Sequence, residues 1–170
     1  TVEVKDAQGE TAKQDVVVTI HGSNDTPVIT SDAQTGSVTE ATLTTGDSST
    51  PDATSGTITF ADVDLNDTHT TSVVTGSTYV WSTGEDLTTE QQAALTAAFK
   101  LDPVSDSTST GAGSQDWTFS IADSSLDFLS EGETITATYT VEVKDAQGAT
   151  ATQDVVVTIH GSNDTPVITS

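Results

Sequence analysis

The chain has 170 residues and is strongly acidic, with 26 Asp and Glu against 4 Lys and Arg and a formal net charge of -22. Nucleic acid and anionic membrane surfaces are excluded as partners, because binding to either requires clustered positive charge. The absence of Cys and Met excludes disulfide bonds and suits an extracellular protein.

This acidity does not indicate disorder, because apolar and polar residues alternate through much of the chain as they do in strands. We therefore predict a folded protein whose carboxylates are neutralised by a divalent metal. At this point the charge balance indicates a divalent metal without specifying which one.

Nearly the same sequence stands at both ends of the chain. Residues 1–31 and 140–170 are identical at 29 of 31 positions, with an offset of 139 residues. A repeat of this quality indicates a window from a tandem array. The chain is predicted to contain the C-terminal strands of a preceding repeat, one complete β-sandwich repeat and the start of a following repeat, at residues 1–23, 24–162 and 163–170. Residues 1–20 read as a strand pair without its own domain, and one hypothesis is weak self-association through them.

Short stretches rich in Thr and Val, separated by Gly, Asp, Asn and Ser, are typical of strands and turns. In chain order, strands are predicted at 27–31, 56–61, 71–74, 78–81, 116–121 and 135–143. The sequence LTTEQQAALTAAFKL at 87–101 departs from this pattern. It has a Thr N-cap followed by helix-forming residues, and it places Leu95 and Phe99 on one face. We predict a short helix there, followed by a low-complexity loop at 102–115.

The final hairpin shows the strongest strand pattern. The odd positions of 135–143 are Ile, Ala, Tyr, Val and Val, whereas most even positions are Thr. The sequence from Asp145 to Gly148 is predicted to form the turn, with Gly148 at positive φ. Six to eight strands with one helix predict an all-β fold, an antiparallel β-sandwich with a short helix insertion.

The densest acidic group is ADVDLNDTH at 61–69, in which Asp62, Asp64 and Asp67 follow a predicted strand. Such clusters supply the oxygen ligands of Ca²⁺. The segment begins like an EF-hand loop, but its sixth position is Asp67 rather than Gly and its twelfth is Val73 rather than Glu. It is therefore not an EF-hand.

Topology brings three acidic segments together. If strand 27–31 runs away from the linker and strand 56–61 returns, the 61–69 loop lies beside Asn24 and Asp25. The hairpin turn that carries Asp145 must lie at the same pole. We expect one metal site at this joint.

A second acidic group is expected at the opposite pole. Glu40 and the loop LDFLSEGE at 126–133 should face the linker copy Asn163-Asp164. The additional ligand candidates in this loop are Asp127, Glu131 and Glu133.

Other interpretations of these residues are simpler. Acidic loops are often solvated turns. His21, His69 and His160 each read as exposed residues at strand ends, rather than as ligands. Sugar stacking is one role for Tyr79, Trp81 and Trp117, but core packing is the better expectation. No Ser accompanies a His and an acid in an order that suggests a nucleophile, so we do not expect an enzyme.

Several long motifs occur in a characteristic order. The sequence GTITFADVDLNDTHTTSVV, followed by TYTVEVKDAQGATATQDVVVTIHGSNDTPVI, closely resembles the VCBS-type repeat of giant bacterial surface adhesins. Such repeats resemble the extender regions of RTX adhesins, which leave the cell by type I secretion and fold as calcium-loaded Ig-like sandwiches. The layout is also similar to that of cadherin domains, which implies a Greek-key fold. The Gly-rich nonapeptide of the RTX domain proper is absent from this sequence.

The resemblance implies a calcium ligand set. The family's ligands would fall at Asn24, Asp25, Asp62, Asp64, Asp67 and Asp145, and the next joint would begin at Asn163 and Asp164. Where cadherins have their upstream acidic motif, this chain has LDFLSEGE, which makes Asp127 or Glu131 the corresponding candidate.

The expected function is that of a calcium-rigidified extender, or stalk, repeat of a large adhesin in cell adhesion and biofilm formation. Its partners would be neighbouring repeats joined through calcium-bridged linkers. Its location would be extracellular, at the bacterial cell surface. The alternative is a ligand-binding adhesin module that recognises a glycan or another cell-surface protein.

Overall fold

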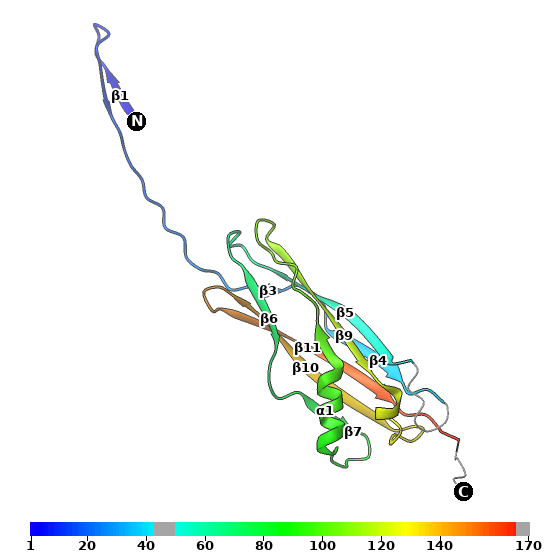
Figure 1. The fold of residues 1–170 in the computed structure, drawn as a ribbon. Coiled ribbons are helices and arrows are strands. Elements are labelled where there is room, and N and C mark those ends of the chain that lie inside the picture. The colour runs from blue at the N-terminus through cyan, green and yellow to red at the C-terminus, as the bar shows by residue number, and fades with distance from the viewer. Residues whose placement is uncertain (43–49, 166–170) are drawn as a thin grey trace.

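The computed structural model of the chain describes residues 1–42 and 50–165 and consists mostly of β-strands (Figure 1). In chain order the elements are β1 (Val2–Lys5), β2 (Thr11–Gln14), β3 (Val28–Ile29), β4 (Gln34–Thr39), β5 (Asp52–Ala61), β6 (His69–Val73), β7 (Thr78–Trp81), α1 (Thr89–Ala98), β8 (Phe99–Leu101), β9 (Ala112–Ile121), the 3-10 helix η1 (Asp123–Ser125), β10 (Thr134–Asp145) and β11 (Thr150–His160). Among the described residues, no helix has the length and apolar character needed to span a membrane.

Two sheets form the sandwich. One has the strand order β3-β5-β9-β8, and the other has the order β4-β11-β10-β6, with β7 also paired to β10. Because the chain crosses between the sheets after β3, β4, β5, β7 and β9, the arrangement is that of an Ig-like sandwich. The predicted antiparallel β-sandwich with one short helix is confirmed.

One strand pair differs from the prediction, because β4 pairs with β11 in parallel. The segment that enters the domain is shared between the sheets, with β3 in the first and β4 in the second. It runs in the same direction as the last strand, so the pairing of β4 with β11 is parallel.

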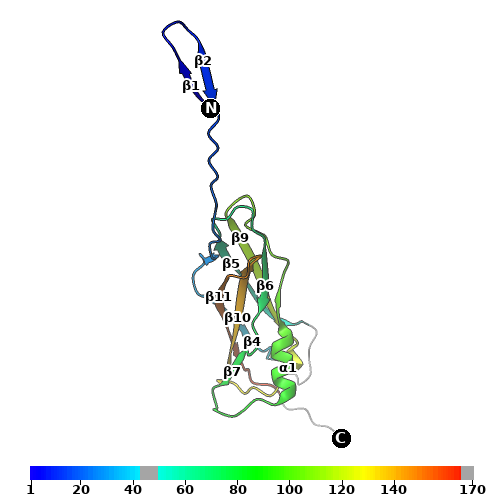
Figure 2. The same ribbon diagram turned by 90° about the vertical axis from the view of Figure 1, so that its left-hand side faces the viewer.

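The chain enters and leaves the sandwich at opposite ends (Figures 1 and 2). We call the end beside Asn24 and Asp25 the upstream end, and the end beside Asp164 the downstream end. The β5–β6 loop and the β10–β11 turn lie at the upstream end, because β5 finishes there and β10 reaches it from the opposite end.

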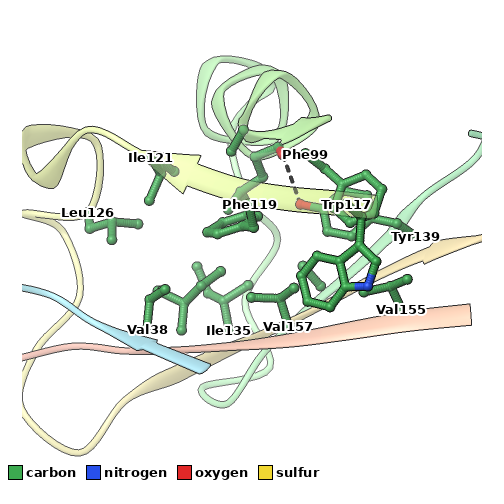
Figure 3. Packing of buried hydrophobic residues seen from close by; sticks show 14 of the residues in the cluster. Val38, Phe99, Trp117, Phe119, Ile121, Leu126, Ile135, Tyr139, Val155 and Val157 are labelled. Carbon is green, nitrogen blue, oxygen red and sulfur yellow. Dashed lines mark hydrogen bonds between the residues drawn. The ribbon is translucent and has the colours of Figure 1, made fainter. Parts of the chain in front are cut away.

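Aromatic rings fill the middle of the core (Figure 3). The ring of Phe99 stacks on Tyr139 with a centroid distance of 4.3 Å, and on its other neighbour Trp117 at 5.8 Å. The polar atoms of both partners are satisfied, since Tyr139 donates to the carbonyl of Leu95 at 2.8 Å and Trp117 donates to Gln34 at 3.0 Å. The predicted core role of Trp117 is confirmed, because its side chain is enclosed and only 1% of the residue is exposed.

The predicted helix is confirmed in position but is shorter than expected. The predicted Thr N-cap of α1 is Thr88. Its side chain accepts from the backbone of Gln91, while the Gln91 side chain accepts from the backbone of Thr88. The helix ends at Ala98 rather than at Leu101, because Phe99 adopts an extended conformation and pairs with Phe119 of β9. Sheet pairing therefore overrides helix propensity over the last three residues.

The predicted loop at 102–115 is also partly wrong. Its last four residues belong to β9, and Ser105 forms an isolated bridge with Ser114. This segment is held in place by hydrogen bonds to the β5–β6 loop, as described below.

Residues 1–20 contain the predicted strand pair, β1 with β2, in the register of its copy in β10 and β11. Their surroundings differ completely. The exposed apolar side chains of the first copy include Val2, Val4, Val16, Val18 and Ile20. The equivalent side chains that are fully buried in the second copy are Val141, Val143, Val155, Val157 and Ile159.

Candidate metal centres

Three buried carboxylates meet at the upstream end. Asp62 follows β5, Asp67 lies in the β5–β6 loop and Asp145 ends β10, and one oxygen of each lies within 4.8 Å of the others. Their exposed fractions are 3%, 8% and 4%. The structure thus brings together the acidic loop and the hairpin turn that the topology argument placed at one pole.

Hydrogen bonds fix the orientation of Asp145. Its Oδ1 accepts from the backbone N–H groups of Gly148 and Ala149 at 2.6 and 2.7 Å, which closes the predicted turn. Its Oδ2 accepts from the side-chain amide of Asn24 at 2.9 Å. The bond from Asn24, together with the backbone donors of the turn, lowers the pKa of Asp145 below its usual value. Asp145 is therefore held as a carboxylate.

The linker contacts the same cluster through backbone and side-chain atoms. The N–H of Asp25 donates to Asp64 Oδ2 at 2.6 Å, and the N–H of Asp64 donates to Asp62 Oδ1 at 2.9 Å. Asn24 and Asp25 remain exposed and Asp64 is half-buried. An open hollow bordered by Asn24, Asp64 and Asp67 gives solvent access to this side of the cluster.

The donor set fits a hard cation. Three carboxylates lie close together and buried, and among the described residues no Lys pairs with any of them. Asp67 Oδ1 accepts from Gln147 at 3.0 Å, but its Oδ2 is buried with no hydrogen-bond partner among the described residues. Because an unpaired buried carboxylate oxygen is costly, this atom is poised to accept an electropositive partner. Oxygen-only clusters of this kind favour Ca²⁺ or Mg²⁺ over softer metals.

His69 lies behind this cluster, and the prediction that it is exposed is wrong. Its side chain is fully buried, with Nε2 3.1 Å from Asp62 Oδ2 and Nδ1 2.8 Å from Asp106 Oδ1. Burial opposes protonation, but hydrogen bonds from the ring to Asp106 and Asp62, together with their charges, outweigh it and raise the pKa of His69. Burial alone would raise the pKa of Asp106. Three hydrogen bonds from His69 and Ser107 outweigh this effect, so the pKa is lowered.

A Ser–His–Asp sequence of contacts exists here, which the amino-acid order did not suggest. The hydroxyl of Ser107 lies 3.2 Å from His69 Nδ1, and the other ring nitrogen faces Asp62. Ser107 is only 1% exposed, so no substrate reaches its hydroxyl. His69 also directs both ring nitrogens at carboxylates, which leaves it no free site to act as a base. This network is structural.

Three further carboxylates meet at the downstream end. Oxygens of Glu40, Asp127 and Asp164 lie within 4.8 Å of one another, and Glu40 is 2% exposed. Glu40 Oε2 accepts from the backbone of Ser162 at 2.8 Å, whereas its Oε1 is buried without a hydrogen-bond partner among the described residues. Burial, followed by the charges of the neighbouring Asp side chains, raises the pKa of Glu40 to about 7.

A second carboxyl pair lies next to this downstream cluster. Asp123, at the start of η1, accepts from the N–H of Ala41 at 2.8 Å. Burial, and then the charge and hydrogen bond of Asp123, raise the pKa of Asp52. The amino-acid sequence does not mark Asp52, Asp106 or Asp123 as candidates, because each is a single acidic residue with no other acidic residue beside it.

The remaining predicted ligands lie outside the two clusters. Glu131 and Asn163 are exposed, and Glu133 accepts from the backbone of Ser130 at 3.1 Å within its own turn. Of the aromatic side chains considered for sugar stacking, Trp117 is buried and Trp81 packs edge-on against Phe128 at 5.3 Å.

No protein-family model matches the chain, and no curated protein matches it. Among solved structures, it is similar to a PapD-like domain of human CEP192, with 15% identity, a TM-score of 0.44 and coverage of 91% of this chain and 98% of that one. It is similar to the CooA pilin subunit of enterotoxigenic Escherichia coli, with 8% identity, a TM-score of 0.47 and coverage of 82% and 100%. It is also similar to AggA, the major subunit of aggregative adherence fimbriae type I of Escherichia coli, with 9% identity, a TM-score of 0.38 and coverage of 84% and 99%. Similarities at these levels carry no argument about function.

Proposed function

We propose that this chain is a spacer repeat of a large bacterial surface adhesin, and that calcium stiffens the joints between successive repeats. The proposal rests on the resemblance of its motifs to VCBS-type repeats and on the two carboxylate clusters. The observation that carries it is the upstream cluster of Asp62, Asp67 and Asp145. The cluster is buried, one of its oxygens has no hydrogen-bond partner in the described part of the chain, and linker residue Asn24 donates a hydrogen bond to it.

The tandem repeat explains why clusters lie at both ends. Asn163-Asp164 is the sequence copy of Asn24-Asp25. A following repeat with the same fold would therefore bring its own upstream cluster to Asp164, which already lies beside Glu40 and Asp127. Each joint would then contain carboxylates from two domains and from the linker between them.

Electrostatics connects this arrangement to stiffness. Without a cation, the crowded carboxylates of a joint repel one another and favour an open linker. Bound Ca²⁺ removes this repulsion and links both domains through shared oxygens. At a concentration tenfold above its dissociation constant, each bound ion adds about 1.4 kcal/mol to the stability of the folded form. Two or more ions per joint therefore contribute a large fraction of the marginal stability of one domain.

Thermal unfolding in Ca²⁺, Mg²⁺ and EDTA tests the calcium site. We expect the melting temperature to rise by roughly 3–6 °C for each site at a tenfold excess of Ca²⁺ over its dissociation constant. Asp145→Asn should reduce this rise, because it removes a ligand charge and keeps the acceptor of the turn. Asp154→Asn is the matched control, since Asp154 is exposed on β11, away from both clusters. Equal melting temperatures in Ca²⁺ and EDTA would refute the proposal.

Small-angle scattering tests the mechanical part separately. The sample is a protein with two complete repeats joined by the natural linker. The maximum dimension should increase and the curve should become that of a rod when Ca²⁺ is added. A scattering curve that stays the same after chelation would mean that the ions stabilise single domains and do not stiffen the joint.

A further inference from the structure

The segment between β8 and β9 contributes no carboxylate to the upstream cluster, yet it is attached to the loop that does. The hydroxyl of Thr108 donates to the carbonyl of Asp67 at 2.6 Å. The N–H of Ser109 donates to the carbonyl of Leu65 at 2.7 Å, and the N–H of Asp62 donates to the carbonyl of Gly111 at 3.1 Å. The loops before β6 and before β9 also lie side by side in both views (Figures 1 and 2).

His69 is the side-chain link between this segment and the cluster. One ring nitrogen faces Asp62, a member of the cluster, and the other faces Asp106, which is not a member. The ring also packs against Phe60 with a centroid distance of 5.1 Å. Because both nitrogens have carboxylate partners and the ring packs against Phe60, these contacts hold the orientation of the ring.

Asp106 holds the ring and the backbone together. Its Oδ1 accepts from the His69 ring and from the N–H of Ser107 at 2.7 Å, and its Oδ2 accepts from the N–H of His69 at 3.0 Å. One carboxylate therefore fixes both where β6 begins and how its first side chain points.

Asp62 is restrained in consequence. Its Oδ2 faces His69, and its Oδ1 accepts from the N–H of Asp64. With one contact on each oxygen, the carboxylate plane is set, and the remaining lone pairs are available to the cluster. Outer contacts of this kind commonly change the metal affinity of a ligand by 10- to 100-fold.

We propose that His69 and Asp106 are positioning residues for Asp62, so that cation affinity at the upstream end depends on a segment that supplies no ligand. The proposal rests on the proposed calcium site. It adds that order in residues 106–111 and occupancy of the site are coupled, because each stabilises the orientation that the other needs.

Calcium titration by calorimetry, on the whole chain, tests the positioning role. Asp106→Asn preserves the shape of the side chain but removes the negative charge that faces His69. Asp106→Ala removes the contacts with His69 entirely. We expect calcium binding to weaken 10- to 100-fold in the Ala variant and less in the Asn variant. Asp116→Asn and Asp116→Ala are matched controls. Asp116 is exposed on β9, and each substitution removes the same charge as its Asp106 counterpart.

A double variant distinguishes positioning from general destabilisation. If Asp106 acts through Asp62, then Asp62→Asn combined with Asp106→Asn should bind no more weakly than Asp62→Asn alone. Hydrogen exchange of the unaltered protein gives a second measurement that needs no variant. The Ser107 and Ser109 amides should exchange more slowly with Ca²⁺ than with EDTA.

The outcomes separate the two proposals. If the unaltered protein binds no calcium, the proposed function fails. If it binds calcium but the Asp106 variants bind as tightly as the Asp116 variants, the positioning proposal fails and the calcium site stands. Additive losses in the double variant, or unchanged exchange of Ser107 and Ser109, would also overturn the positioning role.

Discussion

At the scale of single residues, each cluster contains one buried carboxylate oxygen without a hydrogen-bond partner among the described residues. These atoms belong to Asp67 upstream and to Glu40 downstream. In both side chains the other carboxylate oxygen has a donor, Gln147 for Asp67 and the backbone of Ser162 for Glu40. Burial, and then the charges of neighbouring Asp side chains, make the ionised form of Glu40 costly. A downstream site without metal therefore carries an electrostatic cost that protonation of Glu40 relieves.

The pH dependence of the metal-free protein follows from Glu40. Its pKa is about 7 in the folded chain and 4.5 as the reference value, so the folded state holds the proton more tightly. The stability contributed by this group is fully present below the reference pKa and is lost as the pH rises through 7. In EDTA, the free energy of unfolding should therefore be about 2 kcal/mol higher at pH 5.5 than at pH 8.

Urea unfolding of Glu40→Gln at both pH values checks this prediction. The Gln side chain does not titrate, so most of the difference between pH 5.5 and 8 should disappear. The raised pKa of His69 also makes the protein more stable at the lower pH, so a smaller pH dependence should remain in Glu40→Gln. Glu131→Gln, at an exposed position, should behave like the unaltered protein. A pH dependence that is the same in all three proteins would assign the effect to other groups.

At the scale of elements, local signals predicted where segments begin better than where they end. The N-cap of α1 is encoded within four residues, from Thr88 to Gln91, and the predicted Thr N-cap is confirmed. The end of α1 depends on Phe99 pairing with Phe119, which lies 20 residues away in the sequence. The β10–β11 hairpin was predictable for the same reason as the cap, because its alternation and its turn are local.

The capping box gives an element-scale prediction. Thr88→Ala removes the side-chain acceptor for the N–H of Gln91 and should lower the free energy of unfolding by about 1 kcal/mol. Thr89→Ala, one residue later on the same exposed turn, should cost less, because Ala is the best helix former. Urea unfolding curves of the two variants measure the difference. Equal losses would mean that the capping contact contributes nothing to the stability of the domain.

In the metal centres, too, residues within a local motif could be predicted, whereas residues defined by tertiary contacts could not. Asp62, Asp64 and Asp67 stand in one short acidic segment and could be recognised from the sequence, and Asp145 followed from the hairpin. Asp106 could not be recognised, because its role arises only when the segment before β9 is placed beside β6. Glu131 was a candidate because its loop was expected to face the downstream end, yet the turn that holds Glu133 leaves Glu131 exposed. Side-chain direction within an irregular loop has no period that the sequence reveals.

At the scale of the whole molecule, the two copies of the hairpin compare the same sequence in two environments. Val4 is 68% exposed in the first copy, whereas Val143, its equivalent, is fully buried in the second. In the second copy β10 and β11 lie between β6 and β4, so the hairpin pairs with a further strand along each edge. The first copy has the same register, but among the described residues it has no neighbouring strand on either side. The tandem-array interpretation treats this copy as the last hairpin of another sandwich.

This interpretation predicts that a copy of residues 24–139, fused directly before residue 1, completes a second sandwich. Val4→Asp should leave the melting of the present chain unchanged, because the side chain is exposed. In the fused protein the same substitution should prevent the added domain from folding, because a charge would replace a buried Val without any partner. Calorimetry of the fused protein should accordingly show two unfolding domains without the substitution and one with it. Val143→Asp in the present chain is the positive control, since its side chain is already buried. If Val4→Asp leaves the fused protein unaffected, residues 1–20 do not close a preceding sandwich, and the exposed face of that hairpin has some other partner.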